Sequence, residues 1–314
     1  MREKSRSASP PDRPSALLGV DAGGSQTTAA IAGDNLQVLG RAEGPGAPMR
    51  PGGASASAAI ITETARQAAA TARLRLPADR AVVGAAGAGR TPEQEELAAA
   101  LTHAGVAHRV RVVADAEVAL AAAFERGPGI LLNAGTGSVA FARDPRGQIR
   151  RSGGYGWQLG DEGGGYWLGR VALAAAARAH EGRGEGVALL ERLLAALGLQ
   201  HFDDLIRWGT AATPAQVAAL APHVLAAARE GDGVAQRAVR DGARELVGLV
   251  AALERHFPGG GPVPVALAGG LLLPDSPLSA AVRDALAEHA PRTRVDEGPV
   301  DPVIGALRLA REMD

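Results

Sequence analysis

Two glycine-rich turns carry hydroxyl side chains at positions that could bind phosphate. One spans residues 21–27 and the other residues 133–138, and each lies between two short apolar runs. Glycine lets backbone N–H groups converge on an anion, because no Cβ stands in the way. The hydroxyl donors are Ser25, Thr27, Thr136 and Ser138. Two such turns at matching places in the chain favour phosphate binding over a pair of ordinary hairpin turns.

A third glycine pair, Gly269-Gly270, directly follows an apolar run. It could let the backbone approach a flat base such as adenine, and a tight turn between a strand and a helix explains it equally well. Residues 135–140 fit the dinucleotide fingerprint G-x-G-x-x-A, which requires a helix to follow. Residues 139–145 instead predict a strand and a turn, so a Rossmann site is excluded. The sequence also lacks a P-loop motif and G-x-S-x-G.

Two aspartates close apolar strands. Asp115 ends the apolar run 112–114 and is a candidate catalytic base. Capping of the Ala-rich helix that follows is the alternative, and both roles can hold at once. Asp21 ends the first run beside the first glycine-rich turn, which suits a magnesium ligand acting through water. A turn-forming aspartate is the alternative there.

Residues 153–167 combine seven glycines with both tyrosines and two of the three tryptophans of the chain. Aromatic rings among glycines can form a wall against which a sugar stacks, and Asp161 or Glu162 could accept hydrogen bonds from sugar hydroxyls. A plain loop would not concentrate most of the aromatic residues of the chain. The segment is therefore a candidate sugar site.

Composition excludes several function classes. The formal net charge of −1 gives no general attraction to nucleic acid or anionic membrane. The absence of cysteine excludes disulfides, iron–sulfur clusters and Cys-based zinc sites. Residues 1–14 are polar and predict a disordered tail rather than a secretory signal. We expect a cytoplasmic homodimer that acts on a small molecule, with no nucleic-acid or membrane partner.

The elements that must position these residues recur twice along the chain of 314 residues. Residues 16–115 predict the order β-β-β-α-β-α-β, and residues 129–311 predict β-β-β-α-β-α-β-α with a helical insertion at 185–257. Such a duplicated α/β unit would bind ligands near strand ends that face a cleft between the copies. Ser55 or Ser57 is expected to cap one helix, and Thr91 the next.

These motifs resemble those of N-acetylglucosamine kinases in the BadF/BadG/BcrA/BcrD-type ATPase group, over residues 17–309. The resemblance implies a duplicated α/β fold of the ribonuclease H-like, actin-like ATPase class. It implies a small domain at 15–115 and a large domain at 116–301, with a helix at 302–314 that can pack back on the small domain. The matching segments are residues 21–27, 133–138, 154–157, 160–163, 268–270 and 301–306.

The resemblance implies phosphorylation of an amino sugar, N-acetylglucosamine or glucosamine, on its 6-hydroxyl by ATP with Mg²⁺. Asp115 would be the base and Asp21 the metal ligand. The ATP site would comprise Gly23, Gly24, Ser25, Gln26, Thr27, Gly135, Thr136, Gly137, Gly269 and Gly270. The sugar site would comprise Gly87, Asp115, Ser138, Gly154, Tyr155, Gly156 and Asp161.

Two positions depart from the group. Pro48 and Met49 stand where an asparagine often contacts the sugar, and Gln26 stands where a basic residue is common. Another hexose or a muramic-type sugar therefore stays open as the substrate. The alternative functions are a sugar- or nucleotide-responsive binding protein and an ATPase coupled to a partner. The dehydratase-activating branch, which uses cysteine-bound clusters, is excluded because the chain has no cysteine.

Overall fold

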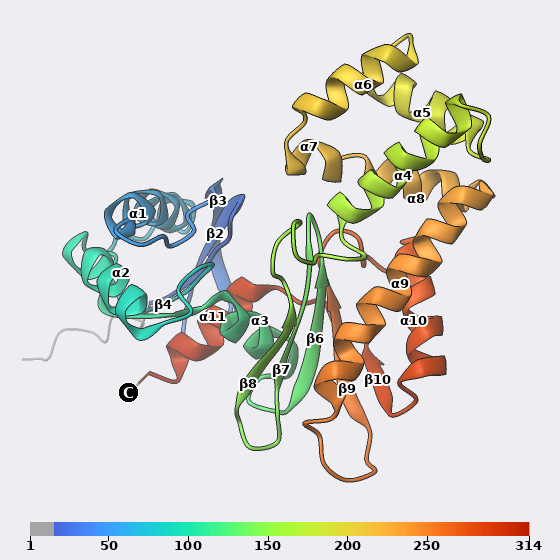
Figure 1. The fold of residues 1–314 in the computed structure, drawn as a ribbon. Coiled ribbons are helices and arrows are strands. Elements are labelled where there is room, and N and C mark those ends of the chain that lie inside the picture. Colours follow the sequence, from blue (N-terminus) through green and yellow to red (C-terminus); the bar gives the residue numbers. More distant parts are fainter. Residues whose placement is uncertain (1–15, 314) are drawn as a thin grey trace, which may run out of the picture. The chain divides into compact units, whose positions relative to one another are not determined.

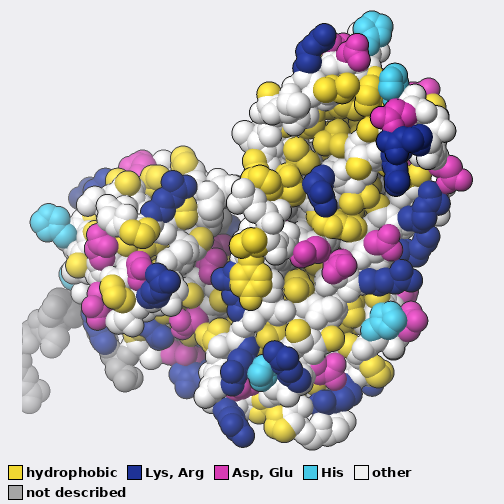
Figure 2. Space-filling model, in the orientation of Figure 1, with side chains coloured by type: hydrophobic (Ala, Val, Ile, Leu, Met, Phe, Trp, Pro, Cys, Tyr) yellow, Lys and Arg dark blue, Asp and Glu magenta, His cyan; other side chains and the backbone are white. Residues whose placement is uncertain are grey.

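The computed structural model describes residues 16–313 (Figure 1), so the predicted disordered tail at 1–14 lies outside the described residues. The chain divides into two compact units. Among the described residues, unit 1 comprises residues 16–125 together with residues 301–313, and unit 2 comprises residues 126–300. Each unit is built on one five-stranded sheet. Figure 2 shows side chains of both charges spread over each unit, as a net charge near zero leads one to expect.

The sheet of unit 1 has the strand order β3-β2-β1-β4-β5. The first three strands form an antiparallel meander, and β4 and β5 run parallel to β1. The strands are β1 (Leu17–Ala22), β2 (Gln26–Ala32), β3 (Val38–Pro45), β4 (Ala78–Ala85) and β5 (Ala107–Ala114). The helices are α1 (Ala54–Thr71), α2 (Thr91–His103), α3 (Asp115–Phe124) and α11 (Pro302–Arg311).

The sheet of unit 2 repeats this plan with the order β10-β9-β6-β7-β8. Its strands are β6 (Gly129–Ala134), β7 (Ser138–Arg143), β8 (Ile149–Gly153), β9 (Val263–Ala268) and β10 (Thr293–Asp296). Its helices are α4 (Gly165–His180), α5 (Val187–Leu197), α6 (Phe202–Ala211), α7 (Pro214–Ala218), α8 (Ala221–Arg229), α9 (Gly233–Glu254) and α10 (Pro277–His289). The predicted duplicated order and its helical insertion are confirmed.

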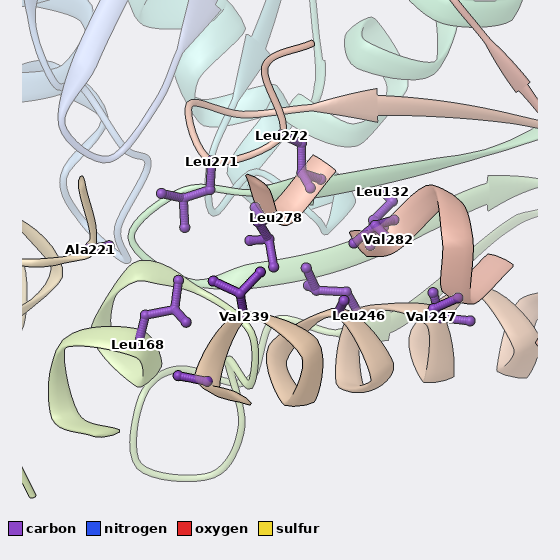
Figure 3. Close-up of a cluster of buried hydrophobic side chains, with 14 of the residues drawn as sticks. Leu132, Leu168, Ala221, Val239, Leu246, Val247, Leu271, Leu272, Leu278 and Val282 are labelled. Carbon is purple, nitrogen blue, oxygen red and sulfur yellow. The ribbon is translucent and has the colours of Figure 1, made fainter. Parts of the chain in front are cut away.

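Alternation along the central strands places a core on each face of the sheets. In unit 1, Leu18 packs in the core with residues of α1 and α2, whereas its neighbour Leu17 packs in the core with residues of α11. Neighbouring residues of a strand point to opposite faces, so a strand with apolar residues at both is covered on both sides. In unit 2, Leu132 of β6 lies in one cluster with Leu246 of α9 and Val282 of α10 (Figure 3).

The sequence misplaced two helix starts. Ser57 does not cap α1, because the helix begins at Ala54 after Gly53, and the Ser57 hydroxyl donates to the carbonyl of Pro48 at 2.9 Å. Thr91 is the first residue of α2 rather than its cap, a place taken by Arg90 without a side-chain hydrogen bond. Tertiary packing, which decides where the chain leaves helical geometry, overrides the local capping preference here.

The division into units differs from the predicted boundary at residue 115. The structure groups α3 with unit 1, because α3 packs against α11, the helix that follows residue 300. The two helices approach closely at Gly305, where an added Cβ would lie 1.8 Å from the carbonyl oxygen of Val118. Within residues 16–313, no helix is both long and apolar enough to cross a membrane.

Two Gly→Ala substitutions should change stability in opposite directions. Gly305→Ala should lower the free energy of unfolding by about 1–3 kcal/mol or more, because its Cβ forces α11 away from α3. Gly248→Ala in α9 is the matched control, since a Cβ there meets nothing within 4 Å. It should raise the free energy of unfolding by about 1 kcal/mol through helix propensity. Thermal and urea unfolding measure both, and equal effects would contradict the proposed helix contact.

Candidate functional site

The carboxyl ends of the parallel strands in unit 1 lie in one row. Ala22 of β1 is paired with Ala85 of β4, which is paired with Ala114 of β5. Asp21 therefore lies one residue before this edge, and Asp115 lies directly after it as the first residue of α3. Ligands of open α/β sheets bind at the carboxyl ends of the strands.

Three carboxylates interact at this edge. Burial, together with the negative charges of Asp115 and Asp301, raises the pKa of Asp21 to about 6. Asp301 accepts a hydrogen bond from the Val303 N–H and caps α11, and it forms an ion pair with Arg41 at 2.5 Å. Without a bound cation, burial and the two neighbouring carboxylates therefore make the ionised form of Asp21 unfavourable. Such a site favours the arrival of a cation.

Asp115 is anchored by its own helix. Its Oδ1 accepts a hydrogen bond from the backbone N–H of Ala116 at 2.8 Å, and the side chain is half-buried. Ala114 is the N-cap of α3, so Asp115 does not cap the helix as the alternative interpretation predicted. It is the first residue of the first turn. A carboxylate in the first turn interacts favourably with the positive end of the helix dipole.

The first glycine-rich turn forms the tip of the β1–β2 hairpin. Its Gly23 N–H donates to the carbonyl of Gln26 at 2.9 Å, and Gly24, Ser25 and Gln26 are exposed. Thr27 is a correction to the predicted donors, because it is 0% exposed and its hydroxyl finds no partner among the described residues. Thr27 lies on the same face of β2 as the buried residues Ala29 and Ile31, but Ala30 and Ala32 are buried as well, so no alternation in the sequence marked Thr27 as buried.

Gly87 lies in an exposed turn after β4 in the same unit. It has a φ of +83°, and a Cβ there would lie 2.1 Å from the carbonyl oxygen of Met49. Packing against the 48–49 segment therefore explains this glycine without a ligand.

The second glycine-rich turn in unit 2 is joined to the start of α4 by backbone hydrogen bonds. The N–H groups of Gly165 and Tyr166 donate to the carbonyls of Gly135 and Thr136, at 2.8 and 2.9 Å. The Asp161 carboxylate lies against the same turn, because a Cβ on Gly137 would lie 2.3 Å from Asp161 Oδ2. The predicted phosphate turn and the predicted sugar residue Asp161 are thus brought together.

Ser138 is a second correction to the predicted ligand contacts. It is 3% exposed, and its hydroxyl donates to the backbone carbonyl of Glu162 at 2.7 Å. The hydroxyl therefore fixes the loop that carries Asp161 rather than facing a ligand. Ser138 lies on the same face of β7 as the buried residues Ala140 and Ala142, but the larger apolar residues Val139 and Phe141 are on the other face, so the sequence did not mark Ser138 as buried.

The third glycine pair lies beside the second turn. Leu271 N–H donates to the carbonyl of Ala134 at 3.1 Å, and Gly269 has a φ of +90°. A Cβ on Gly269 would lie 2.2 Å from that same carbonyl oxygen, so only glycine fits there. The strand after residues 135–137 confirms that no Rossmann helix follows this turn.

Three predicted ATP-site glycines are not required by the fold. An added Cβ on Gly24, Gly135 or Gly270 would meet nothing within 4 Å, and none of the three has a positive φ. Packing explains Gly137 and Gly269 but leaves these three unexplained. Open space above a glycine backbone is what close approach of phosphate or a nucleotide base requires, so the residues present fit ATP.

The sugar loop, which we define as residues 153–164, has an unusual backbone. Asp161 has a φ of +64°, a conformation uncommon for a residue with a side chain. Strained residues gather at functional sites, where the surrounding structure holds them. Gly154 and Gly156 also have positive φ, and Tyr155 between them is 63% exposed beside the Arg151 guanidinium.

An aromatic groove of about 660 Å³ borders this loop. Its walls include Trp157, Tyr166 and Trp167, and the rings of Trp157 and Tyr166 lie 5.2 Å apart. The expected aromatic wall is therefore made by these three residues, while Tyr155 does not line the groove. From the sequence we noted the aromatic cluster but named only Tyr155 among its aromatic residues as a site residue. The sequence could not show which rings converge, because that depends on the geometry of the loop.

A magnesium ion fits this chain only together with other ligands. No group of three or more His, Asp or Glu side chains among residues 16–313 is arranged to hold a metal. Mg²⁺ commonly takes one or two carboxylates and completes its octahedron with waters and substrate phosphates. The buried, charge-repelled Asp21 suits that kind of site.

Replacement of Asp21 should stabilise the chain at neutral pH without divalent cation. Its pKa is higher in the folded state, so the native state binds more protons than the unfolded state between about pH 4 and pH 6. The free energy of unfolding therefore falls as pH rises through this window. Asp21→Asn should raise it at pH 7 by up to about 3 kcal/mol, with the gain lost below about pH 4. Urea unfolding at both pH values, with Asp275→Asn as an exposed control, measures this; an unchanged pH profile would contradict it.

Comparison of the chain with known proteins identifies its family. The BadF/BadG/BcrA/BcrD ATPase family matches residues 18–310. An N-acetylmuramic acid/N-acetylglucosamine kinase of Clostridium acetobutylicum is 33% identical over 232 residues, 73% of this chain and 76% of the relative. An N-acetyl-D-glucosamine kinase of Dictyostelium discoideum is 25% identical over 315 residues, 94% of this chain and 97% of the relative.

The fold is shared with a solved structure. A candidate N-acetylglucosamine kinase from Chromobacterium violaceum has a TM-score of 0.75 and 30% identity, covering 95% of this chain and 99% of that one. The fold class implied by the resemblance is therefore confirmed. The extent of the family match and the identity to the Clostridium relative show that this chain belongs to the BadF/BadG/BcrA/BcrD ATPase family.

Proposed function

We propose that this chain is an ATP-dependent kinase that phosphorylates an amino sugar on its 6-hydroxyl. The observation that carries the proposal is the position of Asp115, directly after the carboxyl edge of a sheet and within electrostatic range of Asp21. The named activities of the relatives support a phosphotransferase and an amino-sugar acceptor.

Asp115 is the proposed general base. The Ala116 N–H and the first turn of α3 orient its carboxylate, which can accept the proton of the sugar hydroxyl. As that proton leaves, the oxygen attacks the γ-phosphorus of ATP, and the bond from phosphorus to the bridging oxygen of ADP breaks. Phosphoryl transfer needs little covalent help, so positioning and electrostatics supply most of the acceleration.

Each unit, taken by itself, offers groups that suit part of a nucleotide. The tip of the first turn offers exposed backbone at Gly24 and the hydroxyl of Ser25, and the second turn offers Gly135 and Thr136. Gly270 provides open backbone for the adenosine. A magnesium ion held near Asp21 would neutralise phosphate charge.

The proposed sugar site is the sugar loop with its aromatic groove. Asp161 can accept hydrogen bonds from ring hydroxyls, and it lies against Gly137 of the second phosphate turn. Stacking on the aromatic rings suits the apolar face of a pyranose. The relatives named for N-acetylglucosamine and N-acetylmuramic acid favour an N-acetylated amino sugar as the acceptor.

Asp115→Asn should lower kcat by roughly 10²–10⁴, because the general base is lost while the side-chain shape is kept. Glu117→Gln is the matched control, since Glu117 lies in the same first turn of α3 and pairs with Arg111 at 3.7 Å. It should keep near-normal turnover. Coupled ADP release with N-acetylglucosamine, glucosamine and no sugar measures both variants. Near-normal turnover of Asp115→Asn would remove Asp115 from its role, and sugar-independent ADP release would favour a plain ATPase.

Gly24→Ala and Gly135→Ala should raise the KM for ATP by roughly tenfold or more, since an added methyl blocks the close approach of phosphate. Both variants should keep the stability of the parent chain, because the methyl meets no protein atom within 4 Å. Gly269→Ala should instead lower the melting temperature through its clash with Ala134. Gly261→Ala, in another open turn, serves as the unaffected control. A parental KM in both hairpin variants would contradict the proposed phosphate site.

A further inference from the structure

A second pocket, of about 560 Å³, lies in unit 2 between β8, the sugar loop and the end of α9. It shares Leu159, Gly160 and Glu162 with the aromatic groove, but no tryptophan lines it. Figure 2 shows dark blue side chains gathered beside a cyan histidine over the lower ends of β8 and α9. We call this pocket the arginine pocket, and the proposed reaction does not use it.

The arginine pocket carries an excess of positive charge. Three arginines line it, namely Arg150, Arg151 and Arg255, against the single carboxylate of Glu162. Arg150 is neutralised by Asp144 at 3.3 Å. Arg151 and Arg255 form no ion pair with any residue in the described part of the chain. The positive charges of these two guanidinium groups are therefore not neutralised by an ion pair.

The remaining walls of the pocket indicate what kind of ligand could carry the anionic group. Leu249, Ala252 and Leu253 of α9 supply an apolar floor, and His256 beside Arg255 offers a further polar group at 3.4 Å from it. Guanidinium groups bind phosphate in a bidentate geometry. A pocket of this size with an apolar floor suits a compact phosphorylated molecule such as a hexose phosphate.

Arg151 connects this pocket to the sugar loop. Its Nε donates to the carbonyl of Gly153 at 2.8 Å, and a terminal nitrogen donates to the carbonyl of Gly154. Its guanidinium carbon lies 5.1 Å from the centre of the Tyr155 ring. An anion that takes the Arg151 N–H groups therefore competes with the contacts that hold the beginning of the loop.

We propose that the arginine pocket is a regulatory site for a small phosphate monoester of the hexose phosphate class. Binding between Arg151 and Arg255 withdraws Arg151 from Gly153 and Gly154, loosens the sugar loop and weakens binding of the acceptor sugar. The effect on the sugar rests on the proposed function, whereas the binding of phosphate does not.

The binding is tested by calorimetric titration of the full chain with inorganic phosphate and with glucosamine 6-phosphate. Arg255→Ala should weaken the binding of both probes roughly tenfold, because one charge-assisted contact is lost. Arg255→Lys should retain part of the affinity. Arg244→Ala, an exposed arginine earlier on α9 that does not line the pocket, should leave it unchanged. Equal affinity of the parent and Arg255→Ala would overturn the site.

The regulation is tested by kinetics with added glucosamine 6-phosphate. The KM for the acceptor sugar should rise in the parent chain, and Arg255→Ala should lose most of this rise while it keeps the parental kcat. Inhibition that persists unchanged in Arg255→Ala would place the sugar phosphate at the catalytic site and overturn the regulation. Absence of turnover with every amino sugar would contradict the proposed function, while phosphate binding that depends on Arg255 would still support the site.

Discussion

Backbone packed directly against backbone at the carboxyl edges of the two sheets is the constraint on which the candidate sites depend. In unit 1, a Cβ on Gly46 would lie 2.3 Å from the carbonyl oxygen of Gly24, so the segment after β3 rests on the first hairpin. In unit 2, a Cβ on Gly164 would lie 2.7 Å from the backbone of Gly137. A side chain would not fit at these contacts, so glycine is required there. Backbone hydrogen bonds hold the turns in place and leave their tips open.

Electrostatic repulsion at the carboxyl edge of the unit 1 sheet lowers the stability of the protein when no cation is bound. Asp21 is buried near two other carboxylates, and only Asp301 among them has an arginine partner, Arg41. Natural proteins hold such unfavourable groups where function requires them, since the rest of the fold supplies the stability that they cost. The same holds for Asp161, whose backbone conformation is costly and whose loop is fixed by the buried hydroxyl of Ser138.

The sugar loop is a shared boundary of two different surfaces in unit 2. Trp157 and the start of α4 form the aromatic groove, and Tyr155 with β8 and the end of α9 forms the arginine pocket. Gly153 packs against Leu249, with 3.0 Å between an added Cβ and the leucine side chain. Events in the arginine pocket therefore act on the same residues that position Asp161.

The sequence by itself determined the features that arise locally. The duplicated element order followed from apolar alternation and turn chemistry, and the Rossmann motif was excluded because a strand follows residues 135–137. Asp21 and Asp115 were recognised at strand ends because strand boundaries are marked by composition. The burial of Thr27 and Ser138 had no such local signal, because β2 is buried on both faces after Thr28 and the larger apolar residues of β7 lie opposite Ser138. Their hydroxyls were therefore interpreted as donors to a ligand.

Only the tertiary structure decided which distant residues meet. Arg41 pairs with Asp301 across 260 positions of the chain, and Gly269 packs on Ala134 because β9 lies beside β6. Neither contact has a signal in local sequence, since strand order and helix packing are set by the burial of whole apolar faces. Helix starts shifted for the same reason, as at Thr91. The pairing of Arg151 with Arg255 in one pocket likewise depends on where α9 crosses β8, which no spacing in the sequence specifies.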